Sequence, residues 1–383
     1  MYKKNLVFAA ACIGMLLFGI VFLSLGTIFT LLKTKFAIDD ITAASLSSLL
    51  PLGMLAGSVI FGPVVDRYGY KNLLIVCSIL ILIGIEIIAF TGVFYLLQAA
   101  FFLIGFGGGA INGGTNALVA DISSEGKGAN LSLLGVFYGI GAISMPVILG
   151  AISKTFSNEA IISGIGLFII LPVIYFIVIG FPVPKQAQGF PLKQGLSLLK
   201  EPILLLFGFV LFFESGLEGI AGNWTTTFMK DGLKLTTEDA LFTLSAQVVA
   251  LTFARLILGK VLKLAKPQIV LFVCYAVIFA GAALLASAPG FTGAVIALAL
   301  LGAGFSAGFP VVLGFVAERF TNLSGTAFSV VLVMALTGNT LMNYLVGAVS
   351  QNFGIQKFPL IIMISAVLMA LLFTSSLRKI SIK

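Results

Sequence analysis

Histidine is absent from the sequence, and charged residues are scarce. Asp, Glu, Lys and Arg make up 9% of the 383 residues, whereas a soluble globular domain carries about 25%. The absence of histidine excludes catalysis by imidazole and metal sites built on imidazole ligands. The scarcity of charge excludes a chain whose surface is mostly in contact with water.

Cysteine is rare as well. The three cysteines, Cys12, Cys77 and Cys274, lie far apart in apolar runs, so we interpret them as small core residues and not as disulfides or metal ligands. No pairing of a nucleophile with a base stands out along the chain. We therefore expect neither an enzyme nor a bound metal or cofactor.

Apolar residues dominate what is present. Hydrophobic residues make up 60% of the chain, and apolar runs of about 20 residues, the length of a helix that crosses a bilayer, recur along it. The sequence predicts an all-α membrane protein with twelve transmembrane spans. The predicted spans are residues 6–33, 42–64, 73–92, 94–121, 128–153, 159–181, 201–228, 240–263, 268–288, 290–317, 325–350 and 357–376. No small-residue cleavage site follows Lys3 and Lys4, so we expect a first span and not a signal peptide.

The chain contains its own copy. A constant shift of 197 positions places Gly62 on Gly259 and superimposes further landmarks without a gap. These are Gly105 on Gly302, Gly107 on Gly304, Asp121 on Glu318, Gly128 on Gly325 and Gly141 on Gly338. Two equivalent apolar bundles facing each other across a pseudo-two-fold axis along the membrane normal are one way in which transporters are built, with the binding site between the bundles. We predict six-helix bundles at residues 1–181 and 201–383, joined by a linker at 182–200.

Basic residues indicate the orientation. An even number of spans puts both termini on one side, and a cytoplasmic placement assigns most of the 22 Lys and Arg residues to the cytoplasmic side, as the positive-inside rule requires. The formal net charge of +8 is then explained by loops at the membrane and not by a nucleic-acid partner. We expect a monomeric, multi-pass protein of a bacterial inner membrane with both termini in the cytoplasm.

A ten-residue motif follows the second predicted span. It reads Gly62-Pro63-Val64-Val65-Asp66-Arg67-Tyr68-Gly69-Tyr70-Lys71. The motif matches G-x-x-x-D-R-x-G-x-K and resembles the loop signature of the major facilitator superfamily. Asp66 can face the positive N-terminus of another helix, and Arg67 can pair with an acid such as Asp121. The counterpart after Gly259 lacks the acid, so we expect one half to carry most of a gate.

Shorter patterns resemble the fucose and glucose symporter branch of that superfamily. They are Glu218 six residues before Trp224, Arg255 four residues before Gly259, and Asn116 in a glycine-rich part of span four. The resemblance implies a sugar symporter whose cavity is lined by spans one, four, seven and ten. The branch often places an acid four positions before the asparagine, where this chain has Asn112, and span one lacks a carboxylate. Proton coupling would then use other residues, and sodium coupling or uniport stay open.

Ionisable residues at membrane depth are costly and mark functional sites. Glu214 and Glu218 lie four residues apart and so share one face of span seven. Two close carboxylates in a medium of low dielectric constant favour protonation of one of them, as a coupling site needs. Neighbouring glycines favour local unwinding of this span. The alternative for both glutamates is a structural acid neutralised by protonation or by an internal hydrogen bond. For Glu86 in span three, a hydrogen bond between helices or a protonated acid that faces lipid explains the residue nearly as well as a function does.

Gate residues are expected at the cytoplasmic helix ends. Asp121 and Glu318 are related by the repeat, and Arg67 and Arg319 are candidate partners. Arg255 near the end of span eight suits a gate ion pair, a solute contact or snorkelling to the membrane surface. The predicted gate set is Gly62, Asp66, Arg67, Asp121, Arg255, Glu318 and Arg319.

Neutral polar residues within the spans suggest a solute with many hydroxyl groups, because amides both donate and accept hydrogen bonds. The predicted binding set is Asn112, Asn116, Tyr138, Asn223, Trp224, Gln247, Asn339 and Asn343. Trp224 is the single tryptophan and can stack on a sugar ring or anchor the chain at the membrane interface. For the asparagines the alternative is a hydrogen bond between helices.

The leading hypothesis is a secondary active transporter that moves a small polar solute, a sugar, by alternating access with coupling to H⁺ or Na⁺. A proton-driven exporter of drugs or metabolites is the alternative; its glycine pattern in span five is present only in part, at Gly135, Gly139, Gly141 and Gly150. A membrane sensor that binds a solute without moving it is a third possibility, and no appended soluble domain supports it.

Overall fold

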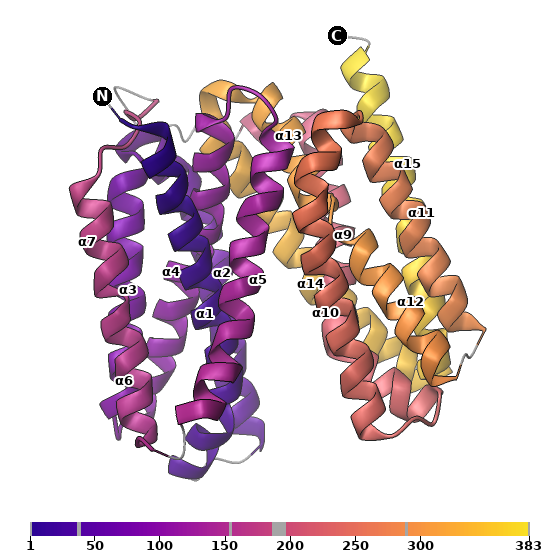
Figure 1. Ribbon diagram of the computed structural model, residues 1–383, viewed down its shortest axis with the longest axis horizontal. Coiled ribbons are helices and arrows are strands. Elements are labelled where there is room, and N and C mark those ends of the chain that lie inside the picture. The colour runs from indigo at the N-terminus through magenta and orange to yellow at the C-terminus, as the bar shows by residue number, and fades with distance from the viewer. Residues whose placement is uncertain (1, 37–39, 153–154, 186–196, 288–289, 382–383) are drawn as a thin grey trace. The chain divides into compact units, whose positions relative to one another are not determined.

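The computed structural model describes residues 2–36, 40–152, 155–185, 197–287 and 290–381, and the chain there is helical (Figure 1). The first half forms α1 (Lys4–Lys35), α2 (Asp40–Tyr68), α3 (Tyr70–Phe90), α4 (Phe94–Ile122), α5 (Lys127–Ile152), α6 (Asn158–Phe168) and α7 (Ile170–Val178). The second half forms α9 (Pro202–Thr227), α10 (Thr237–Leu264), α11 (Pro267–Ala286), α12 (Phe291–Gly304), α13 (Gly308–Arg319), α14 (Ser324–Phe353) and α15 (Phe358–Ser381). Three single turns, η1 (Phe228–Gly232), η2 (Thr321–Leu323) and η3 (Ile355–Lys357), connect helices of the second half.

Within the described residues, 11 helical segments are long and apolar enough to cross a membrane. Two of these segments combine a broken pair of helices, α6 with α7 and α12 with α13. Helix α5 has 26 residues, about 39 Å of helix, and so has the length of a twelfth span. The all-α fold with twelve transmembrane helices agrees with the prediction.

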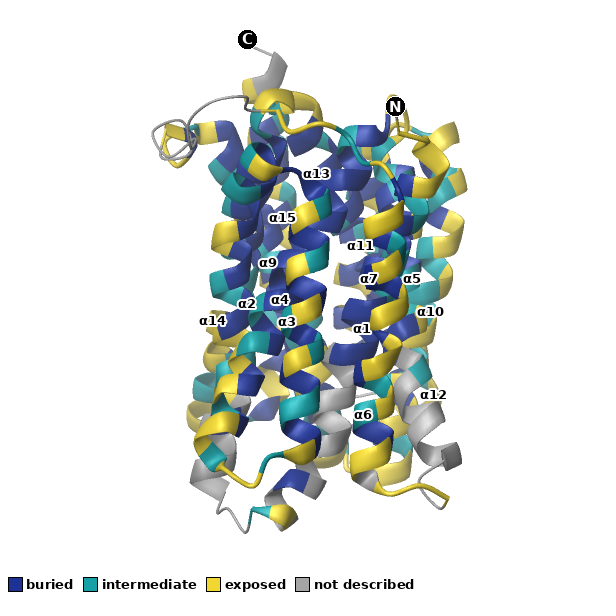
Figure 2. Ribbon diagram, turned by 90° about the vertical axis from the view of Figure 1, so that its left-hand side faces the viewer, coloured by how far each residue is buried: buried dark blue, intermediate teal, exposed yellow. Residues whose placement is uncertain are grey.

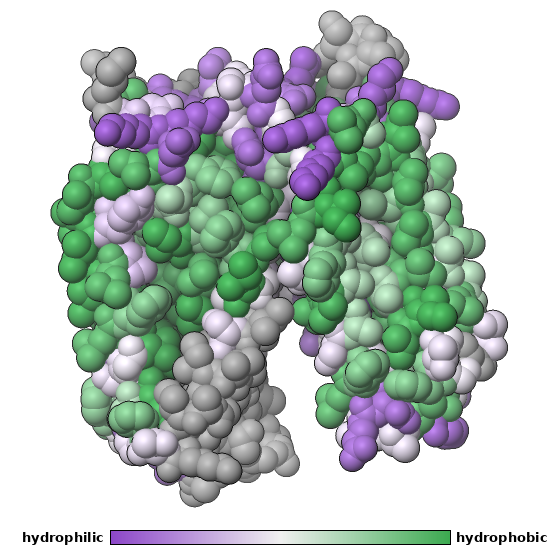
Figure 3. Space-filling view, in the orientation of Figure 1, coloured by the Kyte–Doolittle hydropathy of each residue, from purple (hydrophilic) through white to green (hydrophobic). Residues whose placement is uncertain are grey.

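Apolar side chains also cover the outside of the helices, as a protein surrounded by lipid requires (Figure 3). On α3 the buried face includes Leu74, Cys77 and Ile81, while Val76 and Ile83 on the opposite face are exposed. Figure 2 shows this alternation of buried and exposed positions along the helices. The helices are thus apolar on both faces, one toward the protein and one toward the bilayer.

Contacts divide the chain into two units. Unit 1 comprises Met1–Ile122, Leu134–Gly195 and Phe320–Ser329, and unit 2 comprises Ser123–Leu133, Leu196–Arg319 and Val330–Lys383. The start of α14 therefore packs within unit 1, and the start of α5 packs within unit 2. These two exchanged segments correspond to each other under the shift of 197 positions. The predicted boundaries of the bundles stay a prediction, and residues 186–196 of the predicted linker lie outside the described residues.

Repeat-equivalent glycines make equivalent helix crossings inside each unit. A Cβ on Gly105 of α4 would lie 2.2 Å from the carbonyl oxygen of Leu50 in α2. A Cβ on Gly302 of α12 would lie 2.1 Å from the carbonyl oxygen of Gln247 in α10. Leu50 and Gln247 are themselves 197 positions apart, so the internal repeat extends to the contacts. Only glycine allows the backbones to approach this closely.

The helix break lies in a different span from the one expected. The glycines beside Glu214 and Glu218 predicted unwinding of span seven, but α9 continues without interruption from Pro202 to Thr227. That expectation was wrong, because Gly216 and Gly219 serve as contact surface, packed against Met342 and Asn339 of α14. Breaks occur instead in span six, between α6 and α7, and in span ten, between the end of α12 and the start of α13.

Candidate functional site

Glu218 and Arg255 form an ion pair inside unit 2. Nη2 of Arg255 on α10 donates to Oε1 of Glu218 on α9 across 3.2 Å. Only 11% of the Arg255 side chain and 27% of the Glu218 side chain are exposed. Among the residues that the structure describes, nothing accepts a hydrogen bond from the buried Nε of Arg255. The pair thus holds charge at membrane depth and keeps one donor unused.

Glu214 lies one turn earlier on α9 and is fully buried. Neither of its carboxyl oxygens has a hydrogen-bond partner within the described part of the chain. Two carboxyl groups therefore share a single guanidinium in this interior. If both were ionised, one negative charge would stay uncompensated in a medium that strongly disfavours it.

The break in span ten lies beside Glu214. Helix α12 ends at Gly304 and α13 begins at Gly308, and a Cβ on Gly308 would lie 2.1 Å from Cδ of Glu214. The first amides of a helix have no acceptor in their own helix and form its positive end. A half-helix that starts at membrane depth is a common element of solute and ion sites in transporters.

An amide network links α9 and α14 in unit 2. The Asn343 Oδ1 accepts hydrogen bonds from Nδ2 of Asn223 at 3.0 Å and from Nε1 of Trp224 at 3.2 Å. The Asn343 Nδ2 donates to the Asn339 carbonyl oxygen at 2.8 Å, and Asn339 Nδ2 donates to the Ser215 carbonyl oxygen at 2.9 Å. Four residues of the predicted binding set thus lie together. The exposed Asn223 lies at the open edge of this network.

The other predicted binding residues divide between the units. In unit 1, Asn116 Nδ2 donates to the Asn112 carbonyl oxygen at 2.8 Å, so the two amides lie on one face of α4. Tyr138 of α5 lies beside Phe18, with ring centroids 5.5 Å apart. In unit 2, Gln247 is buried, and its Oε1 has no partner among the described residues.

Asp66 and Gly62 of the ten-residue motif contact the start of α14 within unit 1. The buried Asp66 Oδ2 accepts hydrogen bonds from the backbone N of Thr326 at 2.9 Å and from its Oγ1 at 2.6 Å. The backbone N of Gly62 donates to Oγ of Ser329 at 2.9 Å. Asp66 therefore caps the positive end of α14, as its position in the motif predicts.

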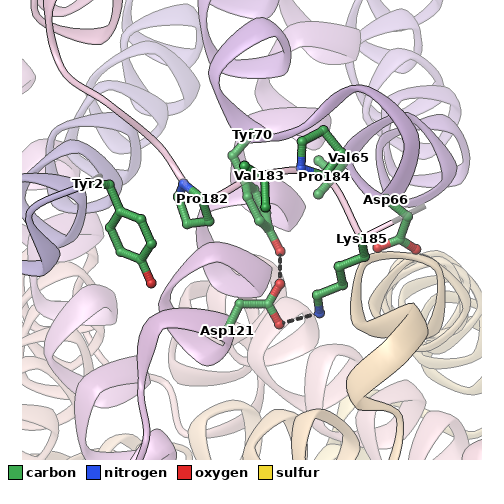
Figure 4. Close-up of a pocket in the computed structure, with 9 residues that line it drawn as sticks. All are labelled: Tyr2, Val65, Asp66, Tyr70, Asp121, Pro182, Val183, Pro184 and Lys185. Carbon is green, nitrogen blue, oxygen red and sulfur yellow. Dashed lines mark hydrogen bonds and ion pairs between the residues drawn. The ribbon is translucent and has the colours of Figure 1, made fainter. Parts of the chain in front are cut away.

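Asp121 has Lys185 as its ion-pair partner, at 2.7 Å. Its other carboxylate oxygen accepts a hydrogen bond from the Tyr70 hydroxyl, and Ser324 Oγ donates to Oδ1 at 2.7 Å. Figure 4 shows Asp121, Lys185 and Tyr70 beside a cavity of about 130 Å³. The cavity is lined by Tyr2, Val65, Asp66, Tyr70, Asp121, Pro182, Val183, Pro184 and Lys185.

The remaining gate candidates lie at the surface or face other groups. The guanidinium of Arg67 lies over the Tyr68 ring, 5.8 Å from its centroid. Glu318 and Arg319, at the end of α13, are exposed.

Glu86 on α3 accepts a hydrogen bond from Ser163 of α6 at 2.8 Å. This is the contact between helices that the structural interpretation of Glu86 predicts.

Unit 2 has no acid at the position that corresponds to Asp66 of unit 1. Lys263 stands at the position equivalent to Asp66 and is exposed. Lys127 Nζ donates to the Ala317 carbonyl oxygen at 3.2 Å, and Ser132 Oγ donates to the Arg255 carbonyl oxygen at 2.7 Å. Ser132 is the repeat equivalent of Ser329. The starts of α5 and α14, which are equivalent in the repeat, thus each make contacts within their unit. An acid, Asp66, takes part in these contacts only at the start of α14.

Several residues of these contacts were not predicted, namely Lys185, Tyr70, Ser132, Ser329, Ser324 and Thr326. Comparing the two repeats position by position could have found the two serines, because each follows its helix start at the same distance. The place of Lys185 could not be found in this way, because it belongs to the connection between the repeats. Within the described residues, no cluster of three or more Cys, Asp or Glu residues could hold a metal ion.

The helices, the repeat and the buried acids are features of a polytopic membrane transporter. The chain belongs to the Major Facilitator Superfamily, whose family model matches residues 10–338. A comparison by sequence with curated proteins gives no match.

Solved structures share this fold along nearly the whole chain. The transporter FucP in its outward conformation, described in a second structure as the fucose:proton symporter of E. coli, is 18% identical with a TM-score of 0.81, and the match covers 96% of this chain and 98% of FucP. The proton:xylose symporter XylE is 16% identical with a TM-score of 0.76, covering 97% and 95%. The human organic anion transporter MFSD10 is 15% identical with a TM-score of 0.77, covering 98% and 100%. At these identities the similarity establishes the fold.

Proposed function

We propose that this protein is a secondary active transporter that moves a small sugar by alternating access and couples the movement to a proton. The chain would lie in a bacterial inner membrane as a monomer with both termini in the cytoplasm. The predicted bundles, residues 1–181 and 201–383, would move about the bound solute.

The acid pair on α9 is the observation that carries this proposal. Glu214 and Glu218 share the single positive charge of Arg255, so binding one proton makes the group neutral overall. A proton on Glu218 would weaken its ion pair with Arg255 and free the guanidinium, whose Nε has no acceptor among the described residues. Protonation and solute binding would then depend on each other, which is what coupling requires.

The amides support a polyhydroxyl solute. Asn343, Asn339, Asn223 and Trp224 lie together in one hydrogen-bonded network, and the indole adds an aromatic face for a sugar ring. Asn112, Asn116, Tyr138 and Gln247 would add further contacts in the bound state. Structural neighbours that are named as symporters of fucose and xylose with protons favour the same solute class.

The gate set would act at the helix ends, apart from Arg255, whose ion pair with Glu218 lies within the span. We propose that Gly62, Asp66, Arg67, Asp121, Arg255, Glu318 and Arg319 hold one state of the cycle. The capping of α14 by Asp66 supports this role, because such a contact gains energy only while the segment 320–329 stays in place.

Uptake into proteoliposomes tests the proposal. A panel of radiolabelled sugars is offered to the purified full chain under an imposed pH gradient, a Na⁺ gradient or no gradient. We expect accumulation of a sugar that follows the pH gradient. Accumulation that follows only Na⁺ would move the coupling to that ion, and no uptake of any sugar under any gradient would contradict the proposal. Increased drug sensitivity of a deletion strain, together with failed sugar uptake, would favour the exporter instead.

A further inference from the structure

The end of α7 and the residues that follow it contact the ten-residue motif in unit 1. Nζ of Lys71, the last residue of the motif, donates to the carbonyl oxygens of Ile177 at 2.6 Å and Ile179 at 3.4 Å. These carbonyls belong to the end of α7, where the helix leaves its own acceptors without donors. Lys71 therefore caps α7 and fixes the point from which the next residues leave.

The following residues, 182–185, are called the strap here. Gly69 of the motif has a φ of +82°, which a residue with a side chain rarely adopts. A Cβ at this position would lie 3.4 Å from Cγ of Pro184, an ordinary contact distance. Pro182 and Pro184 restrict the backbone of the strap. The motif glycine thus makes the turn into α3, and the strap passes directly beside that turn.

Lys185 ends the strap and makes three polar contacts. Its Nζ lies 2.7 Å from Oδ1 of Asp121, 2.7 Å from the Thr321 carbonyl oxygen and 2.6 Å from Oγ of Ser324. An ammonium group has three N–H donors, so every donor has an acceptor. Figure 4 shows Lys185 reaching across the cavity toward Asp121. One side chain thus connects the strap, the end of α4 and the start of α14.

The strap also shields the carboxylate that caps α14. Asp66 lines the cavity below the strap and is 1% exposed. Its Oδ1 has no hydrogen-bond partner in the described residues, so this oxygen would gain water if the strap lifted. Removing the strap would therefore weaken the hold on α14 twice, through the lost Lys185 contacts and through hydration of Asp66.

We propose that Lys185 is a positioning residue of the transport cycle, which locks the strap over the start of α14 and must release Asp121 before the segment 320–329 can move. The inference rests on the alternating access proposed above. The ion pair is partly solvated, with 26% of the Lys185 side chain exposed. Its strength is therefore moderate and falls as salt rises, which suits a contact that breaks in every cycle.

Labelling of a buried cysteine tests the lock without any transported solute. Ala327 is fully buried in the held segment, so A327C is introduced into the full chain after replacement of Cys12, Cys77 and Cys274. Its reaction with a water-soluble maleimide in proteoliposomes reports how often the segment opens. We expect K185M to speed the reaction roughly three- to tenfold, the factor for loss of a partly exposed charged contact.

Two matched variants separate the lock from general loosening. K185R keeps the charge and the donors and should label at nearly the parent rate, while K200M removes an exposed lysine from the other end of the same connection and should change nothing. Higher salt should speed labelling of the parent but not of K185M. Parent-like labelling of K185M, or equal acceleration by K185R or K200M, would overturn the proposal. Because labelling needs neither a sugar nor a gradient, it stands or falls separately from the proposed transport function.

Discussion

Arg255 Nη2 lies 3.2 Å from Glu218 Oε1, one helical turn from the fully buried Glu214. One guanidinium cannot compensate two carboxylates, and burial makes an uncompensated charge expensive. A neutral state therefore includes one bound proton or cation. Because of this charge balance between the three groups, we expect proton coupling to depend on the α9–α10 contact.

Replacing Glu218 by Gln should uncouple the transporter. A gradient of one pH unit supports about tenfold accumulation per coupled proton, and in E218Q this ratio should fall to about one because the amide carries no exchangeable charge. Exchange of labelled for unlabelled solute should persist, since it needs no net proton movement. Uptake and exchange in proteoliposomes measure the two quantities. Glu238, an exposed acid at the start of α10, gives the control E238Q, and retained accumulation in E218Q would remove Glu218 from the coupling step.

A methyl group on Gly308 should disrupt the contact with Glu214. A Cβ would lie 2.1 Å from the Glu214 Cδ, and overpacking of a buried site costs about 1–3 kcal/mol. We expect G308A to lower the melting temperature and the transport rate. The double variant with E214A should recover stability, because it removes the clashing atoms. In the described part of the chain, no atom lies within 4 Å of a Cβ placed on Gly222, so G222A should behave as the parent. Equal loss in both variants would contradict the role of the contact.

Asn343 should contribute to solute affinity. Its Oδ1 holds Asn223 and Trp224 in place, so N343A removes an amide and releases two neighbours. We expect the KM for the solute to rise about tenfold while the maximal rate changes less, because a lost hydrogen bond to a polar ligand costs about 1–2 kcal/mol. Asn352 of the same helix is exposed and makes the same bond to the carbonyl four residues earlier, which makes N352A the matched control. An unchanged KM in N343A would confine the network to a structural role.

Loss of the Asp66 carboxylate should destabilise the start of α14. D66A leaves the Thr326 amide without its acceptor, and removal of such a cap costs about 1–2 kcal/mol. We expect a lower melting temperature in D66A and a smaller effect in D66N, whose amide oxygen still accepts. Thermal unfolding of the purified protein measures both, with D231A at an exposed acid as the control. A D66A variant as stable as the parent would show that the cap adds nothing.

The fold could be predicted from the sequence because a bilayer imposes simple demands. A helix that crosses it needs about 20 apolar residues, and runs of that length are visible without a structure. The repeat was visible because glycines at close helix crossings, such as Gly105 and Gly302, cannot change without moving two backbones. The helix break was misplaced because glycine favours both unwinding and close packing. In α9 the glycines pack closely against α14, and the helix stays intact.

The candidate site could be predicted in part. Ionisable residues at membrane depth are few, so Glu214, Glu218 and Arg255 stood out. The ion pair between Glu218 and Arg255 depends on how α9 and α10 are rotated relative to each other. A local sequence pattern does not predict this rotation. The partner of Asp121 was missed for a similar reason, because Lys185 lies in a connecting segment whose course is set by tertiary contacts with Gly69 and Lys71. Roles in binding and gating stay predictions until the variants above are measured.

The single tryptophan of the chain offers an optical readout of the amide network. Trp224 is half-buried, and its indole N–H donates to Asn343, so a change in that bond alters the polarity around the ring. Excitation at the red edge of tyrosine absorption would select this one fluorophore without any label or substitution. A shift of its emission on titration with a sugar would report occupancy directly in detergent or lipid, before any transport assay is established.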